Sequence, residues 1–376
     1  QSMQSPTGVN IFAWGNYQIG GGQSNQSATT LDGAPVNMAY INLTSLIPTQ
    51  DAVQEFKIQT NNLGAEFGRF AGGVINMTTK SGSNEFHGSA YEFLRNKVLN
   101  SNTFFNNASG IGTPPFVQNQ WGANVGGPIV RDRVFFFSSY ESYRQRQGRS
   151  LLLDSPTPLQ QQGDFSEVGR AVHDPFSVSS AGDLPRTRFQ NDVVPAAMQD
   201  ATARSLSHLW DQPNQPGLNN NYATNASDGG NNTQFNNRVD WSASDKHRFM
   251  GRWTWWDNLT FGVDPYGTGA HIDAGPETFT TNQWVLGDTW LISPTTILDL
   301  RASWTRFRYD RSPASQGTDL TQFAWPSSLV GQIPENFRHI PTPCVESYGL
   351  FCAQGTGSII IARQDNVAFL PSLTLI

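Results

Sequence analysis

The sequence has few charged residues, few lysines and few cysteines. Asp, Glu, Lys and Arg make up 14% of its 376 residues, whereas about a quarter is usual in soluble domains. Low charge together with 12% aromatic residues excludes a disordered polar chain and a Lys/Glu-rich helical protein. The net charge is −6, and Arg144, Arg146 and Arg149 form the only basic cluster. Nucleic acid is therefore not expected as a partner, because no basic stripe could neutralise phosphates.

Long apolar runs and catalytic motifs are also missing. Runs such as Val134–Phe137 are far shorter than the ~20 residues of a transmembrane helix. The six histidines are scattered, and neither His-Glu-x-x-His, Gly-x-Ser-x-Gly nor a phosphate-binding Gly-x-x-x-x-Gly-Lys loop occurs. The sequence therefore predicts that the chain is not an enzyme and holds no cofactor or resident metal.

The two cysteines, Cys344 and Cys352, lie close together in a stretch rich in proline and glycine. A four-ligand zinc site is not expected there. A local disulfide is the favoured interpretation, with two free thiols as the alternative. A disulfide would place this segment in an oxidising compartment.

The abundant residues point to β structure. Gly (35), Phe (24) and Trp (11) are frequent, and glycine, asparagine, threonine and aromatics together are typical of strands joined by turns. After residue 85, strands are predicted at 86–95, 120–130, 133–145, 234–243, 247–257, 279–292, 297–308 and 358–370. Their connections alternate between very short and long, which is the pattern of an outer-membrane barrel with tight periplasmic turns and long extracellular loops.

Alternation within the strands supports this interpretation. One face of 235–242 carries Phe235, Val239 and Trp241, and the other carries Arg238 and Asp240. The segments 248–255 and 298–305 alternate in the same way, with Trp253, Trp255 and Trp304 on the apolar side. Such a period of two also occurs in half-buried strands of soluble antiparallel sheets. The asymmetric loop lengths favour the membrane barrel, in which these aromatics would face lipid.

The first 82 residues and the longest loop are organised differently. Residues 28–36 predict a strand broken at Asp32-Gly33, 51–60 a strand with or without a short helix before it, and 74–80 a strand. Residues 196–210 could form a short amphipathic helix after Pro195. The acidic segment 228–232 could bind Ca²⁺, although a solvated turn is the favoured alternative.

Several motifs resemble TonB-dependent outer-membrane receptors. They are most similar to the Oar-like group, whose members carry a carboxypeptidase-regulatory-like N-terminal domain. The most specific motifs lie in 53–62, 65–69, 71–82 and 86–96, and weaker similarity continues through 126–129, 135–141, 162–166, 245–248 and 292–296.

The resemblance implies a plug (1–82) followed by the first part of a barrel, about eight strands (83–376). Family members have about 22 strands, and a closed barrel of eight would leave no room for a plug. A longer protein is therefore expected. The resemblance also implies location in the cell outer membrane, contact with outer-membrane lipid, and import of an unknown extracellular ligand bound mainly by loops 146–233 and 309–357. TonB and its inner-membrane energising complex would act on the plug.

The candidate site residues are charged groups at the contact between plug and barrel. Arg238, Arg248, Arg252 and Arg301 lie on the polar strand faces, which would face the lumen. There they are expected to pair with plug carboxylates such as Glu55 and Glu66. Arg69, in a glycine-rich turn, is expected to contact the wall. A role of these arginines in ligand passage is the alternative.

Two other functions remain open from the sequence. A structural or adhesive surface protein would display the same long loops without transport, and would have no reason to keep a plug. A soluble β-rich carbohydrate-active enzyme or lectin would bury its apolar strand faces between two sheets.

Overall fold

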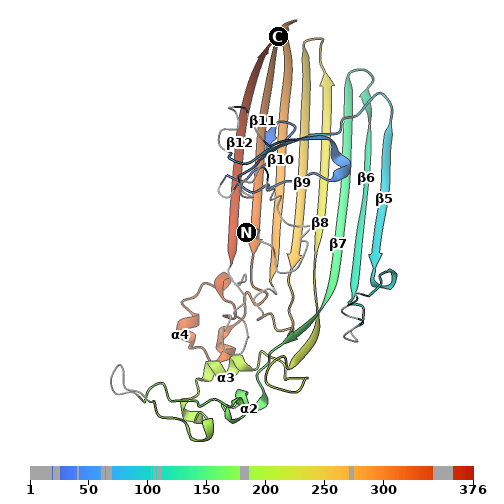
Figure 1. Ribbon diagram of the computed structural model, residues 1–376. Helices are drawn as coiled ribbons and strands as arrows, with labels where there is room; N and C mark the ends of the chain where they lie inside the picture. Colours follow the sequence, from blue (N-terminus) through green and yellow to red (C-terminus); the bar gives the residue numbers. More distant parts are fainter. Residues whose placement is uncertain are drawn as a thin grey trace.

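The computed structural model describes residues 19, 26–39, 42–60, 64, 70–102, 104, 107, 112–177, 186–270, 275–341 and 359–376. Within them the chain forms two sheets (Figure 1). The small sheet has the strand order β2-β1-β4-β3, and the large sheet runs from β5 to β12 in sequence order. Every pairing in the large sheet is antiparallel.

The large sheet is a meander of eight long strands. Their bounds are β5 (His87–Asn96), β6 (Phe116–Val130), β7 (Val134–Leu153), β8 (Tyr222–Ser242), β9 (His247–Phe261), β10 (Pro276–Ser293), β11 (Thr296–Arg311) and β12 (Ile360–Leu375). All eight predicted strands are present. Several are longer than predicted at the end that bears the long connections, so 146–153 and 222–233 belong to β7 and β8 and not to a loop.

The connections confirm the predicted alternation. Short ones at 131–133, 243–246 and 294–295 lie at one end of the sheet, and long ones at 97–115, 154–221, 262–275 and 312–359 at the other. The long connections carry the short helices α2 (Pro158–Gln161), α3 (Ala201–Ser207) and α4 (Ser327–Val330), which gather at that end (Figure 1). The predicted helix at 196–210 is split into a 3-10 turn and α3, because Asp200 caps the amide of Ala203 and starts a new helix there. None of the described helices is long and apolar enough to cross a membrane.

The small sheet contains β1 (Ala28–Leu31), β2 (Ala34–Pro35), β3 (Val53–Gln59) and β4 (Val74–Thr79). As predicted, Asp32 and Gly33 break the first strand. Both have positive φ, 51° and 78°, so the chain reverses tightly between β1 and β2. A 3-10 turn, Gln50–Ala52, precedes β3, which settles that segment in favour of a short helix leading into a strand.

The small sheet lies across one face of the large sheet, here called the inner face (Figure 1). The main core forms between them. It joins small-sheet side chains such as Leu31, Ile75 and Met77 to inner-face aromatics such as Trp256 and Phe307. Because buried apolar area is the dominant stabilising term, this contact holds the two sheets together.

The opposite, outer face of the large sheet is apolar and uncovered by described residues. Trp241 and Trp284 are about half exposed, at 48% and 49%. Trp253, Trp255 and Trp304 share this face and are partly exposed. Aromatic rings contact one another across strands, as in Trp253–Trp284, with centroids 5.8 Å apart. These side chains are not buried between two packed sheets, which contradicts the soluble enzyme or lectin alternative.

Candidate functional site

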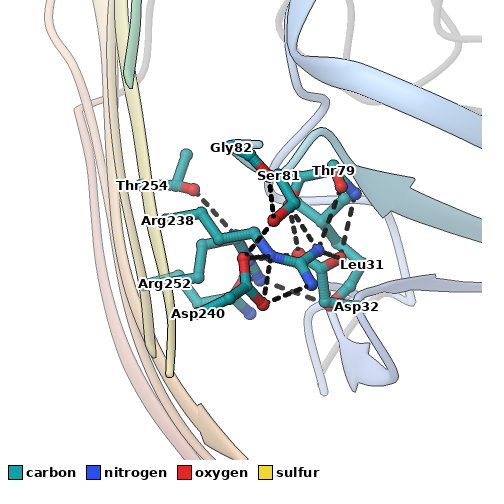
Figure 2. Close-up of polar contacts among 10 residues, drawn as sticks. Leu31, Asp32, Thr79, Ser81, Gly82, Arg238, Asp240, Arg252 and Thr254 are labelled. Carbon is teal, nitrogen blue, oxygen red and sulfur yellow. Dashed lines mark hydrogen bonds and ion pairs between the residues drawn. The ribbon is translucent and has the colours of Figure 1, made fainter. Parts of the chain in front are cut away.

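The candidate site is the polar contact between the tip of the small sheet and the inner face of the large sheet. Asp32, at the β1–β2 turn, contacts two arginines of neighbouring strands (Figure 2). Arg238 of β8 approaches with Nη1 at 3.1 Å from Oδ1, and Arg252 of β9 with Nε at 2.8 Å from Oδ2. The two arginines are cross-strand partners in the β8–β9 register. One carboxylate therefore lies between two guanidinium groups.

Asp32 is held in place from its own side as well. The backbone amide and the hydroxyl of Thr79, on β4, donate to its two oxygens at 2.9 and 2.8 Å. The Asp32 side chain is only 3% exposed. A buried carboxylate needs such donors to offset its lost hydration, and Asp32 receives them from both sheets.

Arg252 is the more deeply buried of the two arginines, with a side-chain exposure of 0%. Its remaining nitrogens donate to the Thr254 hydroxyl at 2.7 Å, to Gln283 Oε1 at 2.6 Å and to the Leu31 carbonyl at 3.3 Å. Among the described residues its ion-pair partner is Asp32 alone. The charge of Arg252 is thus balanced by the small sheet.

Arg238 is shared between the sheets. It forms a forked contact with Asp240 of its own strand, at 2.8 to 3.1 Å, and donates to the Thr79 carbonyl at 3.0 Å. Asp240 in turn accepts from the Ser81 hydroxyl at 2.6 Å. The four charged groups Asp32, Asp240, Arg238 and Arg252 form one neutral network across the contact (Figure 2).

Further along the same contact, inner-face side chains bond to backbone carbonyls of β2 and of the segment between β2 and β3. Gln283 donates to Pro35 O at 3.2 Å, Thr281 to Ser45 O at 2.5 Å, and Gln234 to Ile47 O at 2.8 Å. Side-chain contacts to backbone depend little on the identity of the small-sheet residue. Asp32 therefore supplies the principal charge specificity of this contact.

A cleft of about 440 Å³ adjoins Asp32 on the side of the short turns. Arg238, Arg248 and Arg301 line it, together with Asp240 and Thr289. Arg301 lies 3.2 Å from Asp299. The side chain of Arg248 is exposed and has no hydrogen bond or ion pair to another described residue. The cleft is therefore rich in guanidinium groups.

The structure thus brings together all four predicted arginines, of which Arg238 and Arg252 contact the small sheet directly. Glu55 is exposed on β3 and takes part in none of the described ion pairs. Glu66, Arg69 and both cysteines lie outside the described residues. The sequence identifies Asp32 only as part of an Asp-Gly turn and not as a partner of the arginines. Its carboxylate, in the segment before the arginine-bearing strands, was the one signal that could have indicated this pairing.

The structure contradicts the interpretation of residues 228–232 as a Ca²⁺-binding loop or a solvated turn. Residues 228–232 form part of β8 and are neither a loop nor a solvated turn. Asp228 is buried and pairs with Arg149 of β7. No group of three or more His, Cys, Asp or Glu that could hold a metal ion occurs in the described part of the chain.

At the long-connection end, the loops pack on one another. Trp210, Tyr222 and Tyr266 form a small cluster with Leu153 and Leu209. The rings of Tyr222 and Tyr266 stack with centroids 5.0 Å apart, and burial raises the pKa of the Tyr266 hydroxyl. In the 154–221 connection, Arg188 donates to Asp192 and lowers the pKa of that carboxyl to about 2. These loops are therefore ordered by specific contacts.

A long antiparallel meander with a polar inner face, an aromatic outer face, and tight turns at one end defines part of an outer-membrane barrel wall. Comparison with known proteins agrees. A family model described as an outer membrane beta barrel domain matches residues 78–370. The TonB-dependent transporter Oar of Myxococcus xanthus is 33% identical over 137 residues, which cover 33% of this chain and 12% of the relative.

Solved structures with a similar arrangement include the siderophore receptor PirA of Acinetobacter baumannii. It is 14% identical with a TM-score of 0.48, over 95% of this chain and 40% of that one. The outer membrane transporter YddB of Escherichia coli is 11% identical with a TM-score of 0.48, over 80% of this chain and 33% of that one. The chain thus spans less than half the length of these relatives.

The chain belongs to the outer membrane beta barrel domain family, and part of it is similar to the TonB-dependent transporter Oar. Its location in the outer membrane follows. The predictions of a mostly-β fold, an outer-membrane barrel and this location are confirmed. The large sheet is from here on called the barrel wall.

Proposed function

We propose that the full-length protein imports a ligand across the outer membrane, and that residues 1–82 are part of the plug that closes its barrel, whose first part is 83–376. The observation that carries this proposal is the docking of the small sheet on the inner face of the wall through Asp32, Arg238 and Arg252. An adhesive surface protein would not need a separate sheet held inside its wall.

The proposal assigns different tasks to the two ends of the wall. The long connections, within 146–233 and 309–357, would bind the extracellular ligand. At the other end, TonB with its inner-membrane energising complex would pull on the plug. Release would require the Asp32 contacts to break, because they join the tip of the small sheet to two wall strands.

The test measures movement, so that the ligand need not be known. Thr305 lies on the inner face, is buried, and accepts from Gln283, which also bonds to the small sheet. The variant Thr305→Cys is made in the full-length receptor, with Cys344 and Cys352 changed to serine. In cells, a maleimide reagent should label it only when TonB and the proton gradient are both present.

Two controls sharpen this experiment. Arg308→Cys lies on the exposed outer face and should react equally with or without TonB. A cysteine pair at Ser45 and Thr281, whose backbone carbonyl and hydroxyl are hydrogen bonded, should suppress labelling of Thr305→Cys when oxidised. Labelling of Thr305→Cys that is unchanged in cells without TonB would contradict the proposal.

A further inference from the structure

We propose that Arg238 and Arg252 form an oxyanion-binding site in the barrel wall, which Asp32 of the small sheet occupies until the small sheet moves away. The ligand class is a small carboxylate or phosphate group, such as one carried by the imported molecule. The movement rests on the proposed function above, whereas the existence of the site does not.

Most of the groups that hold the two arginines belong to the wall, and the small sheet adds the carbonyls of Leu31 and Thr79. Arg252 is completely buried, and the Thr254 hydroxyl and Gln283 Oε1 hold its terminal nitrogens from neighbouring wall positions. Arg238 is held by the forked contact with Asp240. Both guanidinium groups would therefore keep their positions if Asp32 left.

Charge makes the empty site unfavourable. The wall brings four arginines to this region, Arg238, Arg248, Arg252 and Arg301. Among the residues that the structure describes, the wall supplies only Asp240 and Asp299 as ion-pair partners of these arginines. Without Asp32 the wall would carry an excess of positive charge, and Arg252 would be a buried cation without a counterion, which is strongly destabilising.

The bound carboxylate indicates which ligands the site accepts. Two guanidinium groups contact opposite oxygens of Asp32. Guanidinium groups bind planar carboxylates and phosphate oxygens through such paired contacts. The adjoining cleft of about 440 Å³, lined by Arg248 and Arg301, provides room for the remainder of a molecule whose anionic group replaces Asp32.

The test uses the purified full-length receptor and sulfate as the probe. Asp32→Gly removes the carboxylate, opens its place between the two guanidinium groups, and is compatible with the positive φ of 51° at this position. Thermal unfolding is followed in sulfate and in chloride at equal ionic strength. Sulfate stabilises folded proteins in general, so the shift of the wild type, whose site Asp32 fills, is the reference. Sulfate should raise the unfolding midpoint of Asp32→Gly by about 2–4 °C more than that of the wild type, because a ligand that binds only the folded state stabilises it.

Two further variants locate the response. Adding Arg252→Gln to Asp32→Gly should reduce the sulfate effect to that of the wild type. Asp365→Asn, which removes the partner of Arg306 from an exposed pair on the outer face, should behave as the wild type. If Asp32→Gly does not fold, Asp32→Ser provides the same measurement. A response of the Asp32 variant no greater than that of the wild type, or one that survives Arg252→Gln, would overturn the site.

Failure of this proposal can be told apart from failure of the proposed function. The sulfate assay involves neither TonB nor movement of the small sheet. TonB-dependent labelling of Thr305→Cys without a sulfate response would support the proposed import and contradict the oxyanion site. A sulfate response without TonB-dependent labelling of Thr305→Cys would support the oxyanion site and contradict movement of the small sheet.

Discussion

The inner and outer faces of the barrel wall differ in how they accommodate charged side chains. On the inner face, Arg252 is fully buried and balanced by a carboxylate from another sheet. On the outer face, arginines such as Arg306 lie near the long connections, exposed, and partly over aromatic rings such as Trp304. The same strands provide both environments, because successive side chains point to opposite faces. A buried charged side chain thus requires a particular counterion, whereas a charged side chain that reaches water or a lipid headgroup does not.

The largest expected effect comes from removing the inner-face carboxylate. Asp32→Ala leaves Arg252 buried without a counterion and should weaken docking of the small sheet by about 3–5 kcal/mol. The rate at which a maleimide reagent modifies Thr305→Cys, a buried inner-face position, would measure this loss. Asp365→Asn is the matched control on the outer face and should change stability by only about 0–1 kcal/mol.

A charge introduced at the centre of the outer face should cost slightly less. Leu286 lies within β10 and is 63% exposed on this face. Leu286→Arg should destabilise the barrel in a bilayer by about 2–4 kcal/mol. Urea unfolding of the full-length receptor in lipid vesicles would measure it. A loss as small as that of Arg308→Leu, nearer the long connections, would contradict the assignment of this face to lipid.

The smallest expected effect is a local pH dependence in the 154–221 connection. Arg188 lowers the pKa of Asp192 to about 2, below its ordinary value of about 3.9. The pair therefore stabilises the loop above about pH 4, and this stabilisation is lost as the pH falls through the folded-state pKa. Hydrogen exchange at Val172, whose amide donates to Asp192, should accelerate over that range. In Asp192→Asn the exchange should lack this acid-dependent step.

The sequence predicted the wall well, because its signals are local. Alternation over residues such as Phe235–Trp241 gives the strand and its faces directly, and the loop lengths give the two ends. The part of β8 nearest the long connections was missed because residues 222–233 are rich in Asn, Gly and Thr and lack an apolar face. Pairing with β7, residue by residue from Tyr222 onward, makes this segment a strand despite its composition.

The site was only partly predictable. The polar faces identified Arg238 and Arg252 as lumen-facing, but their partner depends on how the small sheet docks. Glu55 is a candidate partner by its charge alone, and it lies exposed on β3. The Asp32-Gly33 pair predicts a turn of the backbone and indicates nothing about which residue the carboxylate of Asp32 contacts. Contacts between residues more than 200 positions apart, as between Asp32 and Arg252, are set by tertiary structure. The disulfide between Cys344 and Cys352 stays a prediction.

The most direct test of the account is a double-mutant cycle between Asp32→Asn and Arg252→Gln in the full-length receptor. Docking of the small sheet would be measured in all four proteins by the rate at which a maleimide reagent modifies Thr305→Cys, a buried inner-face position. If the small sheet is held by this buried pair, the two changes should be coupled by about 2–3 kcal/mol. Additivity within about 0.5 kcal/mol would contradict the central role of Asp32 at the inner face.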